Sequence, residues 1–386
     1  MPYQIQNNID ELIKLRHALH AIPETAGEES ETAQKIESFL KNTCPDNITT
    51  GIGGKGLVAE YSGKNEGPAV MIRCELDGLP IAEENDMDYK STNDGNGHKC
   101  GHDGHMAILC GLAKWLGEMR PDKGKVFLLF QPAEETGQGA QWMLNDEKFN
   151  AFNPDYIFAL HNVPGFEKNQ IICRNDVFAA ASAGFIAKLK GATSHAAHPE
   201  EGNNPAPAMA QTIQLLSSFP QFYASLDKAV KATIIQSHLG ERAFGTSPGE
   251  ATVMATLRAY DDKIIEQLKK RANKMARGIA DTYELKLKTE WTEAFAATVN
   301  DEDSVSVIKK AAMNNNLDFI KKEVPFPWSE DFGHFTNKFK GAMFGLGAGT
   351  DHPELHASNY DFPDNIIETG VKMFAEIIEI VLSSET

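Results

Sequence analysis

The sequence predicts an α/β protein in which a central mixed sheet lies between layers of helices and a smaller domain is inserted into the chain. Three observations predict this class: short apolar runs alternate with segments of helical spacing, the order of elements changes near residue 180, and the alternation returns after residue 295. Strands that alternate with helices favour a largely parallel sheet that is buried on both faces. The length of 386 residues also fits two unequal domains better than one core.

The first part of the chain is expected to begin with two helices. Apolar positions recur at helical spacing between residues 8 and 42, on either side of a Pro-Glu-Thr-Ala-Gly break that predicts a turn. A third helix is expected from about Gly104 to Met119. The β-rich runs of this part predict four strands, which span 56–62, 69–76, 125–131 and 156–162.

The middle of the chain has a different order of elements. A strand at 185–191 and a helix at 205–219 are followed by two more strands, a helix that Asp261 caps, and an alternating strand at 284–292. The order β-α-β-β-α-β is that of a ferredoxin-like domain. The expected division is therefore a catalytic domain in two parts, 1–179 and 295–386, with an inserted domain at 180–294.

Composition excludes several classes of function. The formal net charge of -17 would repel phosphate backbones and anionic membrane surfaces, so neither a nucleic acid nor a membrane is expected as a partner. The longest apolar runs, such as 126–130, are too short to cross a bilayer. The N-terminal segment lacks the pattern of a secretory signal, and the odd number of cysteines, five, does not make a disulfide framework. We therefore expect a cytoplasmic protein.

The densest group of polar residues is His-Lys-Cys-Gly-His-Asp-Gly-His at 98–105, between an expected strand and a helix. Thiolate and imidazole donors together suit Zn, Ni, Co or Mn better than Mg or Ca. Cys100 and His102 lie two positions apart, so an extended loop turns both to one side, whereas His105 on a first helical turn would face elsewhere. The pattern alone leaves open which members bind an ion.

Further candidates follow other strands. Glu134 and Glu135 come directly after the strand at 125–131, where sites lie in open α/β sheets, and adjacent carboxylates can divide the roles of metal ligand and proton acceptor. His161 closes the next apolar strand. His352 and His356 lie in a loop near the C-terminus, and His195 follows the first strand of the inserted domain, where an ordinary turn histidine is an equal alternative.

Eight segments in this order and spacing carry a resemblance over nearly the whole chain. They resemble the aminoacylase and carboxypeptidase-type metallopeptidases, in the amidohydrolase branch that includes hippurate hydrolase, N-acyl-L-amino acid amidohydrolase and indoleacetyl-amino-acid hydrolases. Eight motifs in register are far more specific than any one of them. The segments are 16–24, 73–80, 100–105, 131–140, 159–164, 194–199, 329–332 and 355–362.

The resemblance implies a metal-dependent exopeptidase fold with two divalent ions (Zn, Mn, Ni or Co) in the site. It implies that Glu134 is the general base and that Asp77 supports the ligands, while Glu75 stands where distant relatives have a ligating histidine. It also implies a homodimer formed by the inserted domain, in which His195 is lent to the partner's site to stabilise the developing oxyanion. The implied metal ligands are Cys100, His102, Glu135, His161 and His356.

The expected reaction is hydrolysis of the amide bond of small N-acylated amino acids. One departure concerns the substrate carboxylate, because Gly245 stands where relatives carry an asparagine. Arg258 could bind the carboxylate instead, and Trp328 could line the acyl pocket. Two alternatives remain: a dipeptidase or carboxypeptidase that uses the same metals, and a binding protein without catalysis on the same fold.

Overall fold

The computed structural model describes residues 8–383, in two compact units. Unit 1 comprises the chain up to Phe178, Thr298–Pro325 and the chain from Asp331, and unit 2 comprises Ala179–Ala297 and Phe326–Glu330. The first seven residues, which begin the N-terminal segment without a secretory pattern, lie outside the described range. Between residues 8 and 383 no helix combines the length and apolar character needed to cross a membrane.

Unit 1 is built on an eight-stranded mixed sheet with the order β1-β2-β4-β3-β5-β16-β6-β15. The central neighbours β4, β3, β5 and β16 run parallel, whereas β1, β2 and β6 each join the sheet by antiparallel pairs. The predicted α/β class with a mixed sheet is therefore confirmed. The strands are β1 (Asn47–Ile52), β2 (Gly56–Ser62), β3 (Asn65–Glu75), β4 (Lys123–Gln131), β5 (Tyr156–Pro164), β6 (Ile171–Cys173), β15 (Phe319–Lys321) and β16 (Lys340–Gly349), with β7 (Asp176–Ala179) paired to β14 (Thr298–Asn300) apart from them.

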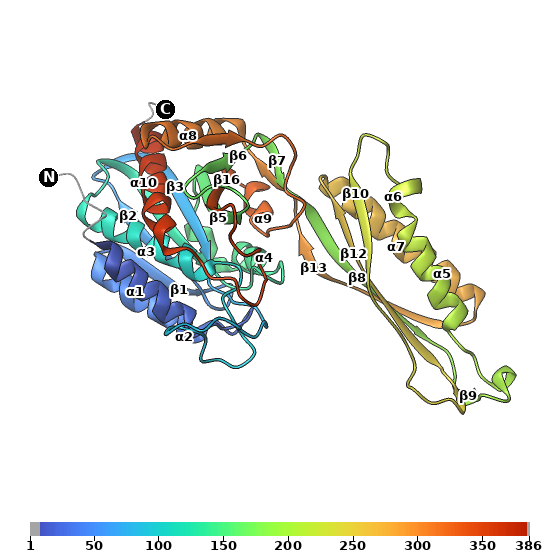
Figure 1. Cartoon of the computed structure of the whole chain (residues 1–386). Coiled ribbons are helices and arrows are strands. Elements are labelled where there is room, and N and C mark those ends of the chain that lie inside the picture. The colour runs from blue at the N-terminus through green and yellow to red at the C-terminus, as the bar shows by residue number, and fades with distance from the viewer. Residues whose placement is uncertain (1–7, 384–386) are drawn as a thin grey trace. The chain divides into compact units, whose positions relative to one another are not determined.

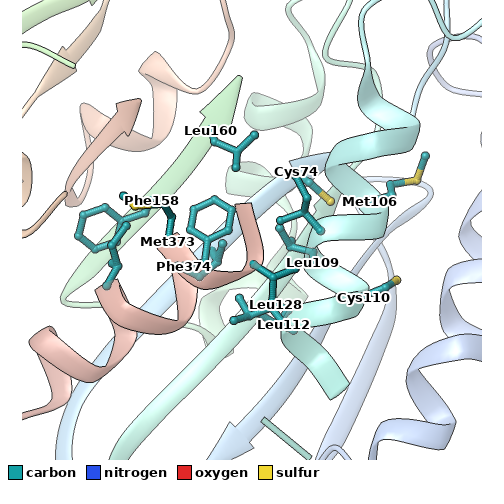
Figure 2. Close-up of a cluster of buried hydrophobic side chains, with 14 of the residues drawn as sticks. Cys74, Met106, Leu109, Cys110, Leu112, Leu128, Phe158, Leu160, Met373 and Phe374 are labelled. Atoms are coloured by element: carbon teal, nitrogen blue, oxygen red, sulfur yellow. The ribbon is translucent and has the colours of Figure 1, made fainter. Parts of the chain in front are cut away.

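Helices α1, α3 and α10 of unit 1 pack against one another beside the sheet (Figure 1). The core lies between α3, α10 and the central strands, where Leu109 of α3 and Phe374 of α10 are buried together (Figure 2). Gly370 allows this packing, because a Cβ there would lie 2.5 Å from Cδ1 of Ile108. The helices are α1 (Ile9–His20), α2 (Ser30–Leu40), α3 (His102–Glu118), α4 (Gly139–Asn145), α8 (Glu302–Asn314), α9 (Gly333–Thr336) and α10 (Ile367–Ser383).

Unit 2 is a four-stranded antiparallel sheet with the order β10-β12-β8-β13, accompanied by α5 and α7 (Figure 1). Asp261 is the N-cap of α7, as predicted, because its side chain accepts a hydrogen bond from the Lys263 N–H. The elements are β8 (Ala181–Lys190), α5 (Ala206–Ser217), α6 (Phe219–Phe222), β10 (Val230–Leu239), β12 (Glu250–Ala259), α7 (Asp262–Thr282) and β13 (Lys286–Phe295), with β9 (Ser194–His195) paired to β11 (Thr246–Ser247).

Candidate metal centre

The candidate metal centre of unit 1 lies where β3, β4 and β5 end. These strands are parallel neighbours, so their carboxyl ends meet at one edge of the sheet, the usual place for a site in this class of fold. Asp77 follows β3, Glu134 and Glu135 follow β4, and His161 lies in the last part of β5. Helix α3 begins at His102, which adds its first turn to the same edge.

Three of the expected donors converge closely. The ligand atoms of Cys100, His102 and His161 lie within 4.8 Å of one another, and Cys100 Sγ is 3.5 Å from His161 Nε2. Nδ1 of His102 donates to the backbone carbonyl of Asp77, and Nδ1 of His161 to that of Asn162, each at 2.9 Å. Because carbonyls only accept, these bonds assign the proton to Nδ1 and leave the Nε2 lone pairs directed at the centre.

Nε2 of His102 is the strongest sign that something is bound here. It is buried and has no hydrogen-bond partner among residues 8–383. Leaving a polar atom in that state costs roughly 1–3 kcal/mol, so buried polar atoms are nearly always satisfied in native proteins. A transition-metal ion would satisfy this nitrogen together with the neighbouring thiolate and imidazole, which is the donor chemistry that such ions prefer.

The two adjacent glutamates extend the group of donors. Glu134 Oε2 lies 3.8 Å and Glu135 Oε1 3.9 Å from His102 Nε2. The other oxygen of Glu135 is 3.5 Å from His356 Nε2, whose side chain is 51% exposed. Cys100, Glu135 and His356 form a second group of donor atoms within 4.8 Å, so Cys100 belongs to both groups. All six residues expected at the centre are therefore brought together.

His105 of the 98–105 segment and His352 of the C-terminal loop form hydrogen bonds away from these donor groups. His105 uses both ring nitrogens, at 2.6 Å from Glu75 Oε2 and at 2.6 Å from Asn162 Oδ1. His352 Nε2 donates to the backbone carbonyl of Asp361 at 2.7 Å. Of the two C-terminal histidines, His356 is the one that lies near Glu135, and its backbone has a positive φ of 67°.

Two glycines explain the spacing of the Cys-Gly-His-Asp-Gly-His motif. Gly101 has a φ of 99°, and a Cβ at this position would overlap the side-chain amide of Asn162. A Cβ at Gly104 would overlap the ring of Phe362. Glycine is needed where the backbone turns this tightly against its neighbours, so both positions allow the donors to reach the centre.

The charges around the centre favour a bound cation. Burial lowers the pKa of His102, but the hydrogen bond to Asp77 and the charges of Glu75, Asp77 and Glu135 outweigh burial and raise it to about 10. Burial and the neighbouring His105 instead lower the pKa of His161 to about 3, which keeps this imidazole neutral, as a metal ligand must be. The surplus of carboxylates at His102 would attract a divalent ion as it attracts a proton.

The sequence analysis missed a buried cation behind the centre. Arg73 of β3 pairs with Glu75, donates from Nε to Gln131 Oε1 at 2.8 Å, and lies 2.7 Å from Asp331 Oδ1. Burial would raise the pKa of Glu75, but Arg73 and His105 hold it well below its usual range. An arginine inside an otherwise apolar strand was the signal that could have revealed this network.

Three predicted residues belong to unit 2. His195 is exposed and accepts a hydrogen bond at Nδ1 from the Ala197 N–H at 3.1 Å. Arg258 donates to Ser329 Oγ at 2.8 Å. Burial lowers the pKa of Arg258, and the negative charge of Glu293 only partly offsets this effect. Trp328 is half-buried and stacks on Phe326, with ring centroids 4.7 Å apart.

An α/β sheet whose parallel strand ends gather thiolate, imidazole and carboxylate donors around an additional carboxylate defines a metal-dependent hydrolase. Residues 71–380 match the sequence pattern of the family described as "Peptidase family M20/M25/M40", and the chain belongs to this family. The predicted resemblance to metallopeptidases of the amidohydrolase branch is thereby confirmed.

Relatives and solved structures agree with this assignment. The chain is 30% identical to N-acetyldiaminopimelate deacetylase of Lactobacillus helveticus, over 94% of this chain and 95% of that protein. It is 30% identical to N-acetyl-L-cysteine deacetylase of Bacillus subtilis, over 92% and 84%. The Bacillus subtilis YXEP protein, described as a dinuclear metal-binding peptidase of the M20 family, superposes with a TM-score of 0.80 at 26% identity, covering 98% of this chain and all of that one.

Proposed function

We propose that this protein hydrolyses the amide bond of N-acyl-amino acids, releasing a carboxylic acid and a free amino acid, with two divalent ions per chain. The observation that carries the proposal is the buried Nε2 of His102, bare of hydrogen bonds among the described residues and surrounded by donors. Two relatives whose names describe them as deacetylases of N-acetylated amino acids support the substrate class. A relative described as a dinuclear metal-binding peptidase supports the number of ions.

The proposed ligands are the donors of the two overlapping groups: Cys100, His102, His161, Glu135 and His356. Cys100 belongs to both groups, so its thiolate would be able to hold an ion in either of them. Asp77 supports the ligands, because its Oδ2 accepts the Glu135 N–H at 2.9 Å and its carbonyl fixes the His102 ring. Thiolate and imidazole donors suit Zn, Mn, Ni or Co better than Mg or Ca.

Glu134 has the position of a general base. When bound, the ions would supply a water of lowered pKa and polarise the amide carbonyl. Glu134 is buried, its Oε2 lies 3.8 Å from His102 Nε2, and it forms a further group of donor atoms with His102 and Glu135. We assign it the role of base and not of ligand because the family resemblance implies that role, and a carboxylate beside the ions can accept the proton of this water. The same carboxyl group can then return the proton to the leaving nitrogen, which completes the hydrolysis without another acid.

Unit 2 is proposed to be a ferredoxin-like dimerisation and lid domain. Its element order is β8, α5, β10, β12, α7, β13, and β10 is an edge strand whose side chains are mostly exposed. In such a dimer His195 would serve the oxyanion in the partner's site, since its ring is exposed. Arg258 and Trp328 are the proposed contacts for the substrate carboxylate and acyl group. The five free cysteines suit the reducing conditions of the cytoplasm.

The substrate class is tested on protein that has been chelated and then reloaded separately with zinc, manganese, nickel or cobalt. N-acetyl-amino acids, N-benzoyl-amino acids and dipeptides are assayed side by side by the free amine released. The proposal predicts turnover of acylated amino acids, loss of turnover on chelation, and recovery with at least one metal. Turnover of dipeptides alone would make the protein a peptidase, and substrate binding without turnover would make it a binding protein.

The shared site is tested by mixing two inactive variants. In a dimer of Glu134→Gln and His195→Asn chains, one site combines the intact Glu134 of one chain with the intact His195 of the other. Activity should therefore return when the two variants are unfolded and refolded together, and not when each is refolded alone. A mixture that stays inactive although sedimentation shows mixed dimers would exclude the supply of His195 in trans.

A further inference from the structure

A buried glutamate that the site described so far does not use lies in the turn between α1 and α2. Glu29 is fully buried, and its Oε1 accepts hydrogen bonds from the backbone N–H groups of Gly27 and Ala133, both at 2.8 Å. Its side chain does not cap helix α2, which it precedes. No lysine or arginine among residues 8–383 forms a salt bridge with it. Burying a carboxyl group without a cation costs free energy. The hydrogen bonds from the two backbone N–H groups are therefore the interactions that hold Glu29 in this position.

Ala133, which donates one of the two hydrogen bonds to Glu29, has an unusual backbone conformation. Its φ of 52° lies in the left-handed region, which is uncommon for a residue with a side chain. Ala133 directly precedes Glu134, and its carbonyl accepts the Gly139 N–H at 3.0 Å in the turn that follows. The direction in which Glu134 leaves the backbone therefore depends on the conformation that Ala133 holds.

Buried carboxyl groups accept the backbone N–H groups of the residues directly before and after Glu134. Asp77 accepts the N–H of Glu135, and Glu29 accepts the N–H of Ala133. The first contact also supports a proposed metal ligand, whereas the second touches none of the proposed ligands. Glu29 is thus placed to act on the general base independently of metal binding.

We infer that Glu29 is a positioning residue for the hydrolysis: it holds Ala133 in the left-handed conformation and thereby aims the carboxylate of Glu134. The inference rests on the proposed function, in which Glu134 is the base. The role requires an acceptor atom and not a negative charge, since both partners of Oε1 are neutral N–H groups. Consistent with this, burial and the charge of Asp77 raise the pKa of Glu29 to about 7.

The test compares Glu29→Ala and Glu29→Gln with Glu28→Ala, an exposed glutamate of the same turn. Loss of the acceptor should lower kcat about 10²-fold, the size expected when a catalytic group is misplaced by about 1 Å. KM and metal content should change less than about threefold, because the ligands remain. Glutamine retains Oε1 and should keep most of the wild-type kcat, and the Glu28 variant should equal wild type.

A second substitution separates positioning from a general effect on stability. In the Glu29→Ala background, Ala133→Gly removes the steric cost of the left-handed conformation and should recover kcat about tenfold. Should Glu29→Ala not fold, Glu29→Asp, whose carboxylate is shorter by one methylene, replaces it. The inference is overturned if glutamine is as damaging as alanine, or if glycine at position 133 recovers nothing.

Crystal structures of the Glu29 variants give a readout that does not depend on turnover. Ala133 should leave the left-handed region in Glu29→Ala and remain there in Glu29→Gln. A wild-type protein that hydrolyses neither acylated amino acids nor dipeptides would refute the proposed function, while the backbone at Ala133 would still decide the role of Glu29. An Ala133 conformation that is unchanged in Glu29→Ala would refute the positioning role alone.

Discussion

Two clusters of buried histidine and carboxylate side chains in unit 1 have similar compositions but differ in the hydrogen bonding of their histidine. Around His102, the donors converge and Nε2 has no hydrogen-bond partner among the described residues. Around His20, both ring nitrogens are used, at 2.8 Å from Asp103 Oδ2 and at 3.0 Å from Glu83 Oε1. Proximity alone would allow His20, Asp103 and Asp361 to hold an ion, yet Arg16 lies 3.1 Å from Asp103 and 2.7 Å from Asp361.

The comparison shows that the cations already present, and not a short distance, distinguish the structural network from the candidate metal centre, since Asp103 Oδ1 in the His20 cluster also has no hydrogen-bond partner among the described residues. In the His20 network each carboxylate already faces a cation, so a divalent ion would have to displace Arg16. His102 and Asp103 are neighbours at the start of α3, and their side chains belong to different clusters. We therefore expect substitutions in the two clusters to have different consequences: loss of function around His102 and loss of stability around His20.

The largest expected effect is that of Glu134→Gln. Removing the proton acceptor should lower kcat by about 10²–10⁴-fold, because general acid–base catalysis contributes that much. The free energy of unfolding and the metal content should stay near the wild-type values, since Glu134 is not a proposed ligand. Steady-state kinetics on an N-acyl-amino acid and metal analysis of the same preparation measure both. A variant with wild-type turnover would refute the role of Glu134.

The next effect concerns stability and its dependence on pH. Burial lowers the pKa of His20, but Asp103 and Glu83 outweigh burial and raise it from 6.5 to about 9. A raised pKa means that the folded state holds the proton more tightly, so this stabilisation is complete below pH 6.5 and is lost as the pH rises through about 9. It amounts to something on the order of 3 kcal/mol.

His20→Asn measures this contribution. The difference in unfolding free energy between wild type and His20→Asn, from urea titrations, should be largest near pH 6 and shrink towards pH 10. Metal content should not change, because His20 is not a donor of the centre. The same difference at both pH values, or loss of the metal in this variant, would erase the distinction between the two clusters.

The smallest of these effects is expected for Asp77→Asn. The backbone carbonyl still fixes the His102 ring, and the amide oxygen can still accept the Glu135 N–H, but the negative charge beside His102 is lost. Metal affinity should fall about tenfold, at the low end of what supporting residues contribute. Competition with a chelator measures the affinity, and Asp86→Asn, at an exposed position, is the matched control. Equal affinities in both variants would show that the charge of Asp77 does not matter.

Local patterns predicted much of this fold. The regular spacing of apolar residues predicted α7 with its cap at Asp261, and the strands β2, β3, β4 and β5 of unit 1. The short strands β6 and β15 were not predicted, because three residues are too few to show an alternation. Their pairing is decided by the sheet that they join and not by their own residues.

The same limit applies to the centre. Cys100 and His102 could be identified because the donors stand close together in the sequence, and the strand ends pointed to Glu134, Glu135 and His161. The bond from Ala133 to Glu29 spans 104 positions, and that from Arg73 to Asp331 spans 258. No periodicity connects such residues, so the contributions of Glu29 and Arg73 emerge only from tertiary structure, whereas Asp77 was expected from the resemblance.

Anomalous diffraction from crystals of the protein reloaded with zinc or manganese tests the central claim most directly. The account predicts two anomalous peaks among Cys100, His102, His161, Glu135 and His356, with the Cys100 sulfur next to both, and none at His20. A map without an ion between Cys100 and His356, or with the ion held by His20, Asp103 and Asp361, would contradict it.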